Sequence, residues 1–404
     1  MFIAKRIIKK KSLKGFSTSI ITPPPLVVPP LRQGRTGGSI TQNPLFAVGT
    51  FFQAVIIEKE IIKMKAALLK SWENMEICDM PKPVLEKDEV LIKMIYAGVC
   101  GSDVTVYSGN HPTATAPCIV GHEILGIVEE INSDFPTDIK VGDRVTVNPL
   151  IGCGHCEPCR KGIHVCKSLK LLGIHENGGY AEYTKADIRK VVKINEGISD
   201  RIAALAEPFA VGYHVTMRAG VKMGDSVLII GAGPIGMVLA LSAKAAGADK
   251  IIISEPADTR RSVADEFGFE TINPMDYDDV MTKINELTDG NGFDIVYEVS
   301  GSKAGVLLTT KACKIRGTIV SMGLSGLEYP FPIGTISFKE QTLVGSRTYS
   351  EPNFIGGVRM LEKLDKEYDL SKLISDELTI DQAQEAIDMM INKTNNGKIL
   401  IKCN

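Results

Sequence analysis

The residues with the clearest potential for chemistry lie in "GCGHCEPCRKGIHVC", residues 152–166. This stretch holds four of the nine cysteines in the chain, namely Cys153, Cys156, Cys159 and Cys166. Gaps of two residues let neighbouring thiolates converge on one cation, and four sulfurs match a closed, tetrahedral Zn²⁺ site. Disulfides are the alternative, but bonds between such near neighbours would be strained. His155 and His164 could replace a sulfur, although the cysteine set is already complete. Because a closed site has no open coordination position, we expect it to stabilise a loop rather than to catalyse a reaction.

A second set of potential ligands is spread along the chain. Cys100 lies in "AGVCGSDV", His122 and Glu123 lie in "VGHEILG", and Glu207 lies in "LAEPFAVGYH". A thiolate, an imidazole and a carboxylate can together hold a metal ion with one position left open for a substrate. Each residue alone is a weak signal, because a buried cysteine or histidine more often serves packing. Together with the cysteine cluster they predict a catalytic metal site.

A third motif indicates a dinucleotide. In "SVLIIGAGPIGMVLALSAKAAGADKIIISEP", Gly231, Gly233 and Gly236 form a G-x-G-x-x-G pattern between an apolar strand and a helix. The glycines permit a tight turn and close approach of a pyrophosphate to the helix N-terminus. Glu255 follows at the end of the next predicted strand, where a carboxylate can accept from both ribose hydroxyls and repel a 2′-phosphate.

The same motif leaves the choice between NAD and NADP partly open. Glu255 favours NAD. Arg260 and Arg261 follow closely, and either guanidinium could accept a 2′-phosphate instead of belonging to a solvated helix face. We expect NAD as the cofactor.

The elements that position these residues fall into two patterns. Residues 64–200 contain short β-rich runs broken by glycine and proline, which predicts a largely antiparallel barrel or sandwich. Residues 215–345 alternate strand-like and helix-like runs, which predicts a parallel sheet with helices on both faces. The tail, with an amphipathic "IDQAQEAIDMMIN" and a final "GKILIKC" strand, is expected to rejoin the first domain.

Composition narrows the class of protein. With 404 residues, 44% of them hydrophobic, the chain is long enough for two domains. Residues 1–57 carry eight Lys or Arg and no acidic residue, which leaves a net charge of −10 on residues 58–404. An acidic body argues against nucleic acid as a partner. The apolar run "VLIIGAGPIGMVLALSA" is interrupted by three glycines and a proline, which argues against a membrane span.

The first 63 residues differ from the rest in composition. They are basic, rich in serine and proline, and we exclude them from the fold. One interpretation is an organellar transit peptide, which would place the protein in mitochondria. The other is that translation begins at Met64, which agrees with a cytoplasmic protein.

Seven motifs in a fixed order now point to a family. "GVCGSD", "GHEILGIV", "KVGDRV", "CGHCEPC", "GGYAEY", "EPFAVGYH" and "GAGPIG" together resemble the zinc-containing medium-chain dehydrogenases. The resemblance runs from Met64 to the C-terminus, and it is closest to the sorbitol, threonine and sugar-acid dehydrogenase branch. It implies an α/β protein with a GroES-like catalytic domain over residues 64–214 and 346–404. A Rossmann domain over residues 215–345 would be inserted in it, with the active site in the cleft between them.

The resemblance also implies roles for single residues. Cys100, His122 and Glu123 match the zinc ligands, and Glu207 matches a residue that ligates directly or through water. The resemblance leaves open which carboxylate binds. Asp103 would orient His122 by accepting its other ring N–H, and Ser102 would relay the proton of the alcohol.

Two further positions bear on the ends of the site. Thr105 stands where well-known members pass the proton to a histidine, so a chain of waters would replace that step. Arg347 matches an arginine near the cofactor phosphate or the substrate oxygens, and an ordinary surface ion pair is the alternative. We interpret His111, His175 and His214 as structural or exposed.

The expected function is oxidation of a secondary alcohol on a polyol or sugar acid to a ketone, with NAD and two zinc ions per chain. L-threonine or butanediol dehydrogenation is the alternative within enzymes, and a zinc-stabilised nucleotide-binding protein without turnover is the alternative from another class. The expected partners are a small-molecule substrate and further copies of the chain in a homodimer or homotetramer, with no membrane involved.

Overall fold

The computed structural model describes residues 62–323 and 328–404. The predicted transit peptide or upstream segment lies outside the described residues, except for its last two positions. The first strand, β1, begins at Lys63, so it includes one residue of that segment.

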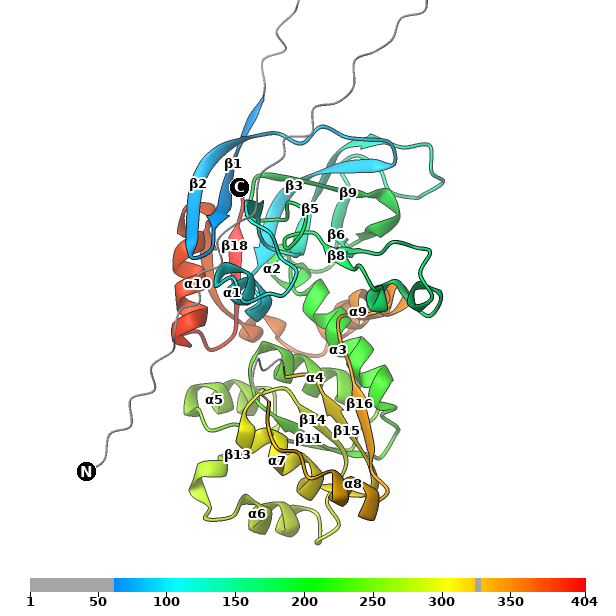
Figure 1. The fold of residues 1–404 in the computed structure, drawn as a ribbon, viewed down its shortest axis with the longest axis vertical. Helices are drawn as coiled ribbons and strands as arrows, with labels where there is room; N and C mark the ends of the chain where they lie inside the picture. The colour runs from blue at the N-terminus through cyan, green and yellow to red at the C-terminus, as the bar shows by residue number, and fades with distance from the viewer. Residues whose placement is uncertain (1–61, 324–327) are drawn as a thin grey trace, which may run out of the picture. The chain divides into compact units, whose positions relative to one another are not determined.

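The N-terminal half of the described chain and its last two strands form mainly antiparallel sheets (Figure 1). One sheet has the order β2-β1-β4, and a larger one has the order β10-β6-β5-β3-β18-β17, with β9 also paired to β3. These strands are β1 (Lys63–Ser71), β2 (Asn74–Pro81), β3 (Glu89–Gly98), β4 (Cys118–Ile119), β5 (Glu123–Asn132), β6 (Arg144–Val147), β9 (Tyr183–Asp187), β10 (Val191–Lys193), β17 (Ile374–Thr379) and β18 (Lys398–Lys402). A two-stranded ribbon of β7 (Leu150–Ile151) and β8 (Lys170–Leu171) flanks the cysteine-rich loop.

The C-terminal tail joins the larger of these two sheets, as the sequence predicts. Strand β18 pairs antiparallel with β3, so that Leu400 lies opposite Gly98. Figure 1 shows this red strand close to the blue and cyan strands that begin the described chain. Helix α10 (Ala383–Asn392) contributes Ala383, Ala386 and Ile387 to the same hydrophobic core.

Three helices connect the antiparallel sheets with a six-stranded parallel sheet. They are α2 (Asp200–Ala203), α3 (Ala206–Ala219) and α9 (Glu351–Leu364). Helix α3 packs closely on α9, where a Cβ on Gly357 would approach the Cα of Ala210 to 2.3 Å. The predicted domain boundary between residues 214 and 215 falls inside α3.

The six-stranded sheet is parallel throughout, and its strands have the order β13-β12-β11-β14-β15-β16. This is the strand order of a Rossmann fold. The strands are β11 (Ser226–Ile230), β12 (Lys250–Ser254), β13 (Glu270–Ile272), β14 (Phe293–Glu298), β15 (Cys313–Ser321) and β16 (Thr342–Gly345). The helices are α4 (Pro234–Ala245), α5 (Asp258–Glu266), α6 (Val280–Leu287), α7 (Lys303–Ala312) and α8 (Ile333–Phe338).

Alternating side chains of β11 serve two cores, one on each face of this sheet. Val227 and Ile229 belong to the same buried cluster as Leu241 of α4. Leu228 belongs to a different cluster, together with Leu308 of α7. Buried, two-sided strands explain the continuous apolar run in the sequence. The fold class expected from the sequence is therefore confirmed. None of the helices in the described residues is long and apolar enough to cross a membrane.

Candidate active site

The register of β3 against β5 brings together the first group of potential metal ligands. Gly98 lies opposite Glu123, so Cys100 and His122 both lie just beyond the paired ends of the two strands. Ligand atoms of Cys100, His122 and Glu123 all lie within 4.8 Å of one another. A Cβ on Gly98 would come within 1.9 Å of Glu123 Oε2, so only glycine leaves room for this carboxylate.

The orientation of His122 follows from its two ring nitrogens. Nδ1 lies 3.3 Å from Asp103 Oδ1, and Asp103 is completely buried. Nε2 faces the other way, 3.5 Å from Ser102 Oγ. Burial disfavours the charged ring, but the Asp103 carboxylate outweighs it and holds the pKa of His122 well above its usual value. The arrangement leaves Nε2 as the ring atom that can bind a metal, on the same side as the Ser102 hydroxyl.

Glu123 is paired with a lysine that the sequence argument missed. Lys398 Nζ lies 2.6 Å from Glu123 Oε1 and also donates to the Val99 carbonyl at 3.1 Å. Both side chains are almost fully buried, at 4% and 1% exposure. The other carboxylate oxygen, Oε2, is buried and has no hydrogen-bond partner among the described residues. An orphaned buried oxygen beside a thiol and an imidazole suits a metal ion.

Lys398 changes the charge balance of the group. If Cys100, Glu123 and Glu207 were all ionised, they would carry three negative charges, one more than the two positive charges of a divalent cation. The ammonium of Lys398 supplies the missing positive charge. The only signal for it in the sequence is a charged residue at the start of the apolar strand "KILIK".

Glu207 lies near this group without belonging to its innermost set. It sits in the first turn of α3 and is 7% exposed. Burial raises the pKa of Glu207 to about 7, with His122 acting against the rise and Glu123 adding to it. These mutual effects place Glu207 within electrostatic reach of both residues, although the close group consists of Cys100, His122 and Glu123.

Thr105, at the expected outer end of the proton relay, bonds to the backbone of its own helix. Its hydroxyl donates to the Gly101 carbonyl at 3.1 Å, one turn back in helix α1 (Gly101–Tyr107). Ser102, one residue into the same helix, is half-buried and faces His122. The outer end of the proton relay stays a prediction.

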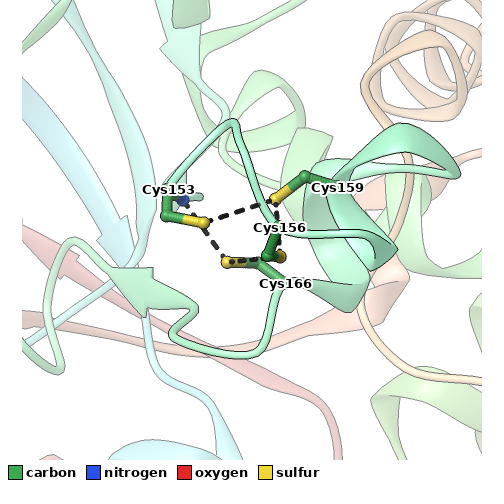
Figure 2. Close-up of side chains that lie close together, drawn as sticks. All are labelled: Cys153, Cys156, Cys159 and Cys166. Carbon is green, nitrogen blue, oxygen red and sulfur yellow. Dashed lines mark hydrogen bonds between the residues drawn. The ribbon is translucent and has the colours of Figure 1, made fainter.

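The second group is the cluster of four cysteines, whose side chains point toward a common centre (Figure 2). The Sγ of Cys159 lies 3.9 Å from that of Cys153 and 3.4 Å from that of Cys156, and Cys156 lies 3.9 Å from Cys166. Sulfurs bound tetrahedrally to zinc at 2.3 Å are about 3.8 Å apart. All four are free thiols, so the disulfide alternative is wrong.

The electrostatics of this lobe differ from one thiol to the next. Burial raises the pKa of Cys159 to about 12, whereas backbone N–H groups lower that of Cys156. The backbone N–H of Cys153, aided by that of Ser168, lowers the pKa of Cys166 to about 6 against the effect of burial. His155 turns away, with Nδ1 2.8 Å from the Cys153 carbonyl oxygen. The ring of His164 lies edge-on to His214, 5.0 Å away between centroids. Neither histidine belongs to the close sulfur group.

The glycine loop between β11 and α4 has the geometry that a pyrophosphate requires. Gly231 has a φ of +113°, which other residues rarely adopt. A Cβ on Gly236 would lie 1.9 Å from the Gly231 carbonyl oxygen, so the helix packs too tightly for any side chain. At Gly233, by contrast, the nearest atom to a Cβ is Arg260 Nη1 at 4.0 Å, which leaves the helix N-terminus open.

Glu255 lies at the end of β12, as predicted, and is 5% exposed. Its two oxygens accept from the backbone N–H of Ala232, at 2.8 Å, and of Ala257, at 3.0 Å. The carboxylate thereby ties the glycine loop to the next turn. Arg261 donates to the Glu255 carbonyl at 2.8 Å and pairs with Asp258, so its guanidinium is already engaged.

Arg347 is exposed and follows β16. Burial, His175 and the charge of Arg347 together lower the pKa of His111, and burial followed by Arg347 lowers that of His164. The charge of Arg347 is therefore close enough to affect His111 and His164. Its expected role beside the cofactor or substrate stays a prediction.

Comparison with known proteins identifies the family. The chain matches the profile of the alcohol dehydrogenase GroES-like domain over residues 86–196. It matches that of the zinc-binding dehydrogenases over residues 234–363. The chain belongs to the zinc-binding alcohol dehydrogenase family.

Characterised relatives of this dehydrogenase act on different alcohols. It is 33% identical to 2-dehydro-3-deoxy-L-galactonate 5-dehydrogenase of Pseudoalteromonas atlantica, over 78% of this chain and 92% of the relative. It is 31% identical to the sorbitol dehydrogenase of Bacillus subtilis, over 82% and 95%. It is 37% identical to L-threonine 3-dehydrogenase of Pyrococcus abyssi, over 71% and 83%.

Solved structures similar to this dehydrogenase hold either nicotinamide cofactor. A zinc-binding dehydrogenase from Sinorhizobium meliloti, bound to NADP, is 29% identical with a TM-score of 0.77, covering 84% of this chain and 99% of its own. An alcohol dehydrogenase from Escherichia coli CFT073, complexed with NADH, is 27% identical with the same TM-score and the same two coverages. Zinc and a nicotinamide dinucleotide thus fit the family, the sulfur cluster and the glycine loop.

Proposed function

We propose that this dehydrogenase oxidises a secondary alcohol of a polyol or sugar acid to a ketone, with NAD as the acceptor and two zinc ions per chain. The observation that carries the proposal is the close group of Cys100, His122 and Glu123, with the Ser102 hydroxyl on the same side of the imidazole. When bound, zinc would lower the pKa of the substrate hydroxyl, and NAD would accept a hydride from the carbon.

The residues of the chain would divide the remaining work. Cys100, His122 and Glu123 would hold the catalytic zinc, because their ligand atoms already lie together. Ser102 would accept the proton of the substrate hydroxyl. Glu207, buried and with its pKa raised to about 7, would face the open position and act there directly or through a water. A Glu123→Gln variant that loses catalytic zinc, beside a Glu207→Gln variant that keeps it, would support this division; the reverse result would assign the ligand to Glu207.

The cysteine lobe would hold the second zinc as a closed, structural site. Sulfur separations of 3.4 to 3.9 Å support this part of the proposal. Elemental analysis of metal-replete, desalted protein should find two zinc ions per chain. A value of one or none would contradict the proposal.

The preference for NAD rests on Glu255 and on the engagement of Arg261. A buried carboxylate at the end of β12 disfavours a 2′-phosphate, and Arg261 is already bound to backbone carbonyls and Asp258. Arg260 Nη1 lies 4.0 Å from the place of a Cβ on Gly233, so it is the arginine that could still accept a phosphate. Glu255→Ala should lower the ratio of kcat/KM for NAD to that for NADP by about tenfold, or 1.4 kcal/mol. An unchanged ratio, or a wild type that prefers NADP, would overturn the assignment.

The substrate class is supported by the relatives that oxidise a sugar acid and a polyol. The relative that oxidises threonine, at 37% identity, keeps threonine as the second candidate. The decisive experiment is a screen for NADH formation by purified protein against hexonates, alditols, inositols, threonine and 2,3-butanediol. Highest kcat/KM on a hexonate or alditol would support the proposal, and highest kcat/KM on threonine or the diol would replace it.

We also propose that the chain associates with a second copy through the β16 edge of the parallel sheet. This edge is unpaired among the described residues, and exposed apolar side chains lie on β16 and on the helix that precedes it, with Leu343 47%, Phe338 90% and Ile333 70% exposed. Two identical edges can pair across a twofold axis and cover these side chains. Light scattering should give a dimer or tetramer, and Phe338→Lys should shift it toward monomer. A monomeric wild type would refute the interface.

For location, we propose the cytoplasm, in agreement with the bacterial relatives. A full-length fusion to a fluorescent protein in eukaryotic cells tests the mitochondrial alternative. Cleavage and mitochondrial import of the fusion would overturn the cytoplasmic assignment.

A further inference from the structure

Asp103, which orients His122, is itself held by a tyrosine from a distant part of the chain. The Tyr180 hydroxyl donates to Asp103 Oδ2 at 3.1 Å, and the Cys100 backbone N–H donates to the same oxygen at 2.9 Å. The other oxygen, Oδ1, is the one that faces His122 Nδ1. Two donors therefore hold Oδ2, while Oδ1 is left to face the imidazole.

Tyr180 and Asp103 are both completely shielded from solvent, at 0% exposure. No water can replace the hydroxyl at this position without moving the surrounding core. Burial, with the neighbouring Asp103 charge adding to it, raises the pKa of Tyr180 well above its usual value. The hydroxyl is consequently a donor to Asp103 at neutral pH.

The ring of Tyr180 also supports the backbone that enters His122. A Cβ on Gly121 would lie 2.3 Å from the Tyr180 ring, so the ring packs directly on this glycine, whose φ is +91°. Backbone bonds join the two segments, from Tyr180 N–H to the Val120 carbonyl at 3.0 Å and from Gly179 N–H to the Gly121 carbonyl at 2.8 Å. One side chain thus touches both the peptide before His122 and the carboxylate beside it.

We propose that Tyr180 is a positioning residue for the catalytic metal site, acting on His122 through Asp103. This inference rests on the proposed function, because it assumes that His122 Nε2 binds the metal. Partners of a metal-binding histidine fix its ring orientation and tune its strength as a ligand. A phenylalanine would keep the packing on Gly121 but leave Asp103 Oδ2 with the Cys100 N–H alone. The imidazole would then be less strictly aimed at the position shared with Cys100 and Ser102.

The test compares Tyr180→Phe with Tyr183→Phe, a matched loss of one hydroxyl from the same "GGYAEY" segment. Tyr183 lies under the ammonium of Lys82, 3.9 Å from the ring centroid, away from the metal groups. Co²⁺ is loaded into the catalytic site in place of zinc, and its affinity and visible spectrum are measured along with kcat, KM for NAD and the pH profile. Tyr180→Phe should bind Co²⁺ about three- to tenfold more weakly, with an altered spectrum and lower kcat but unchanged KM for NAD. Tyr183→Phe should match the wild type.

A double-mutant cycle with Asp103→Asn separates positioning from general stability. If Tyr180 acts through Asp103, adding Tyr180→Phe to Asp103→Asn should cause no further loss of Co²⁺ affinity. Wild-type Co²⁺ affinity and spectrum in Tyr180→Phe, whatever its melting temperature, would overturn the inference and leave the proposed site intact. A wild type that takes up no second metal ion would instead overturn the proposed catalytic site, and this inference with it.

Discussion

The two groups of potential metal ligands in this enzyme are built in opposite ways. The four cysteines of the closed lobe fall within residues 153–166, on a loop between two short strands, and three of them are only partly buried. The open group combines Cys100 and His122 with Glu123 and its partner Lys398, which is 275 residues further along the chain. A local group can hold its own loop together, whereas a dispersed group exists only after β3 has paired with both β5 and the C-terminal strand β18.

The difference extends to how each group manages charge. In the lobe, backbone N–H groups of the loop itself lower the pKa of Cys166 to about 6, whereas burial and the neighbouring thiols raise that of Cys159 to about 12. In the open group, charges are balanced by other side chains, Lys398 against Glu123 and Asp103 against His122. The lobe is therefore expected to contribute mainly to stability, and the open group mainly to turnover.

The largest expected effect is on turnover, from His122→Ala. Loss of the imidazole removes a ligand and the link to Asp103, and kcat should fall by roughly a thousandfold, or about 4 kcal/mol of barrier. NAD binding should change little, because the glycine loop lies on another sheet. Steady-state kinetics and NAD titration check this; near-normal turnover would remove His122 from the site.

Cys156→Ser should produce the opposite pattern. Zinc binding by a structural site contributes folding free energy, so the melting temperature should fall by roughly 10 °C or more, with the remaining folded enzyme nearly as active per molecule. Cys78→Ser is the control, because Cys78 lies on β2 outside both groups. A collapse of activity at unchanged stability would reverse the roles of the two groups.

These two groups also show what the sequence could and could not predict. The cysteine lobe could be predicted because its four ligands lie in one short loop, where the spacing along the sequence decides which side chains can meet. Cys100, His122 and Glu123 were readable from motifs, and Gly231, Gly236 and Glu255 from their order around a strand and a helix. Lys398 and Tyr180 were not, since their roles depend on which strands become neighbours, and an isolated lysine or tyrosine gives no sign of that.

Lys398→Met sharpens the contrast by leaving Glu123 buried without its counter-ion. Breaking a buried ion pair at one end costs about 3–5 kcal/mol of unfolding free energy. Lys65→Met removes the exposed pair with Asp381 and should cause no measurable change. Denaturant unfolding of the zinc-loaded proteins measures both. Equal stability of the two variants would show that Lys398 does not balance the open group.

The pH dependence of the metal-free protein tests the burial of Glu207. Its pKa is raised to about 7 in the folded state, from 4.5, so the folded state binds the proton more tightly than the unfolded state. This contribution is fully present below about pH 4.5 and is lost as the pH rises through 7, at a cost on the order of 3 kcal/mol. Thermal unfolding of chelator-treated protein should show this decline, and Glu207→Gln should lack it. Glu130→Gln, on the exposed face of β5, serves as the control.

The smallest effect is expected from removing residues 1–63, because both metal groups and the glycine loop lie within the remaining chain. The cut at Met64 also removes the Ile62 carbonyl, which accepts from the Lys82 N–H at 2.9 Å at the edge of the first sheet. Loss of one such hydrogen bond costs about 1 kcal/mol. A chain starting at Met64 should therefore bind two zinc ions and oxidise substrate with unchanged kinetic constants, at a slightly lower melting temperature. A fall in kcat of more than about tenfold, or 1.4 kcal/mol of barrier, would mean that the N-terminal segment takes part in forming the open group.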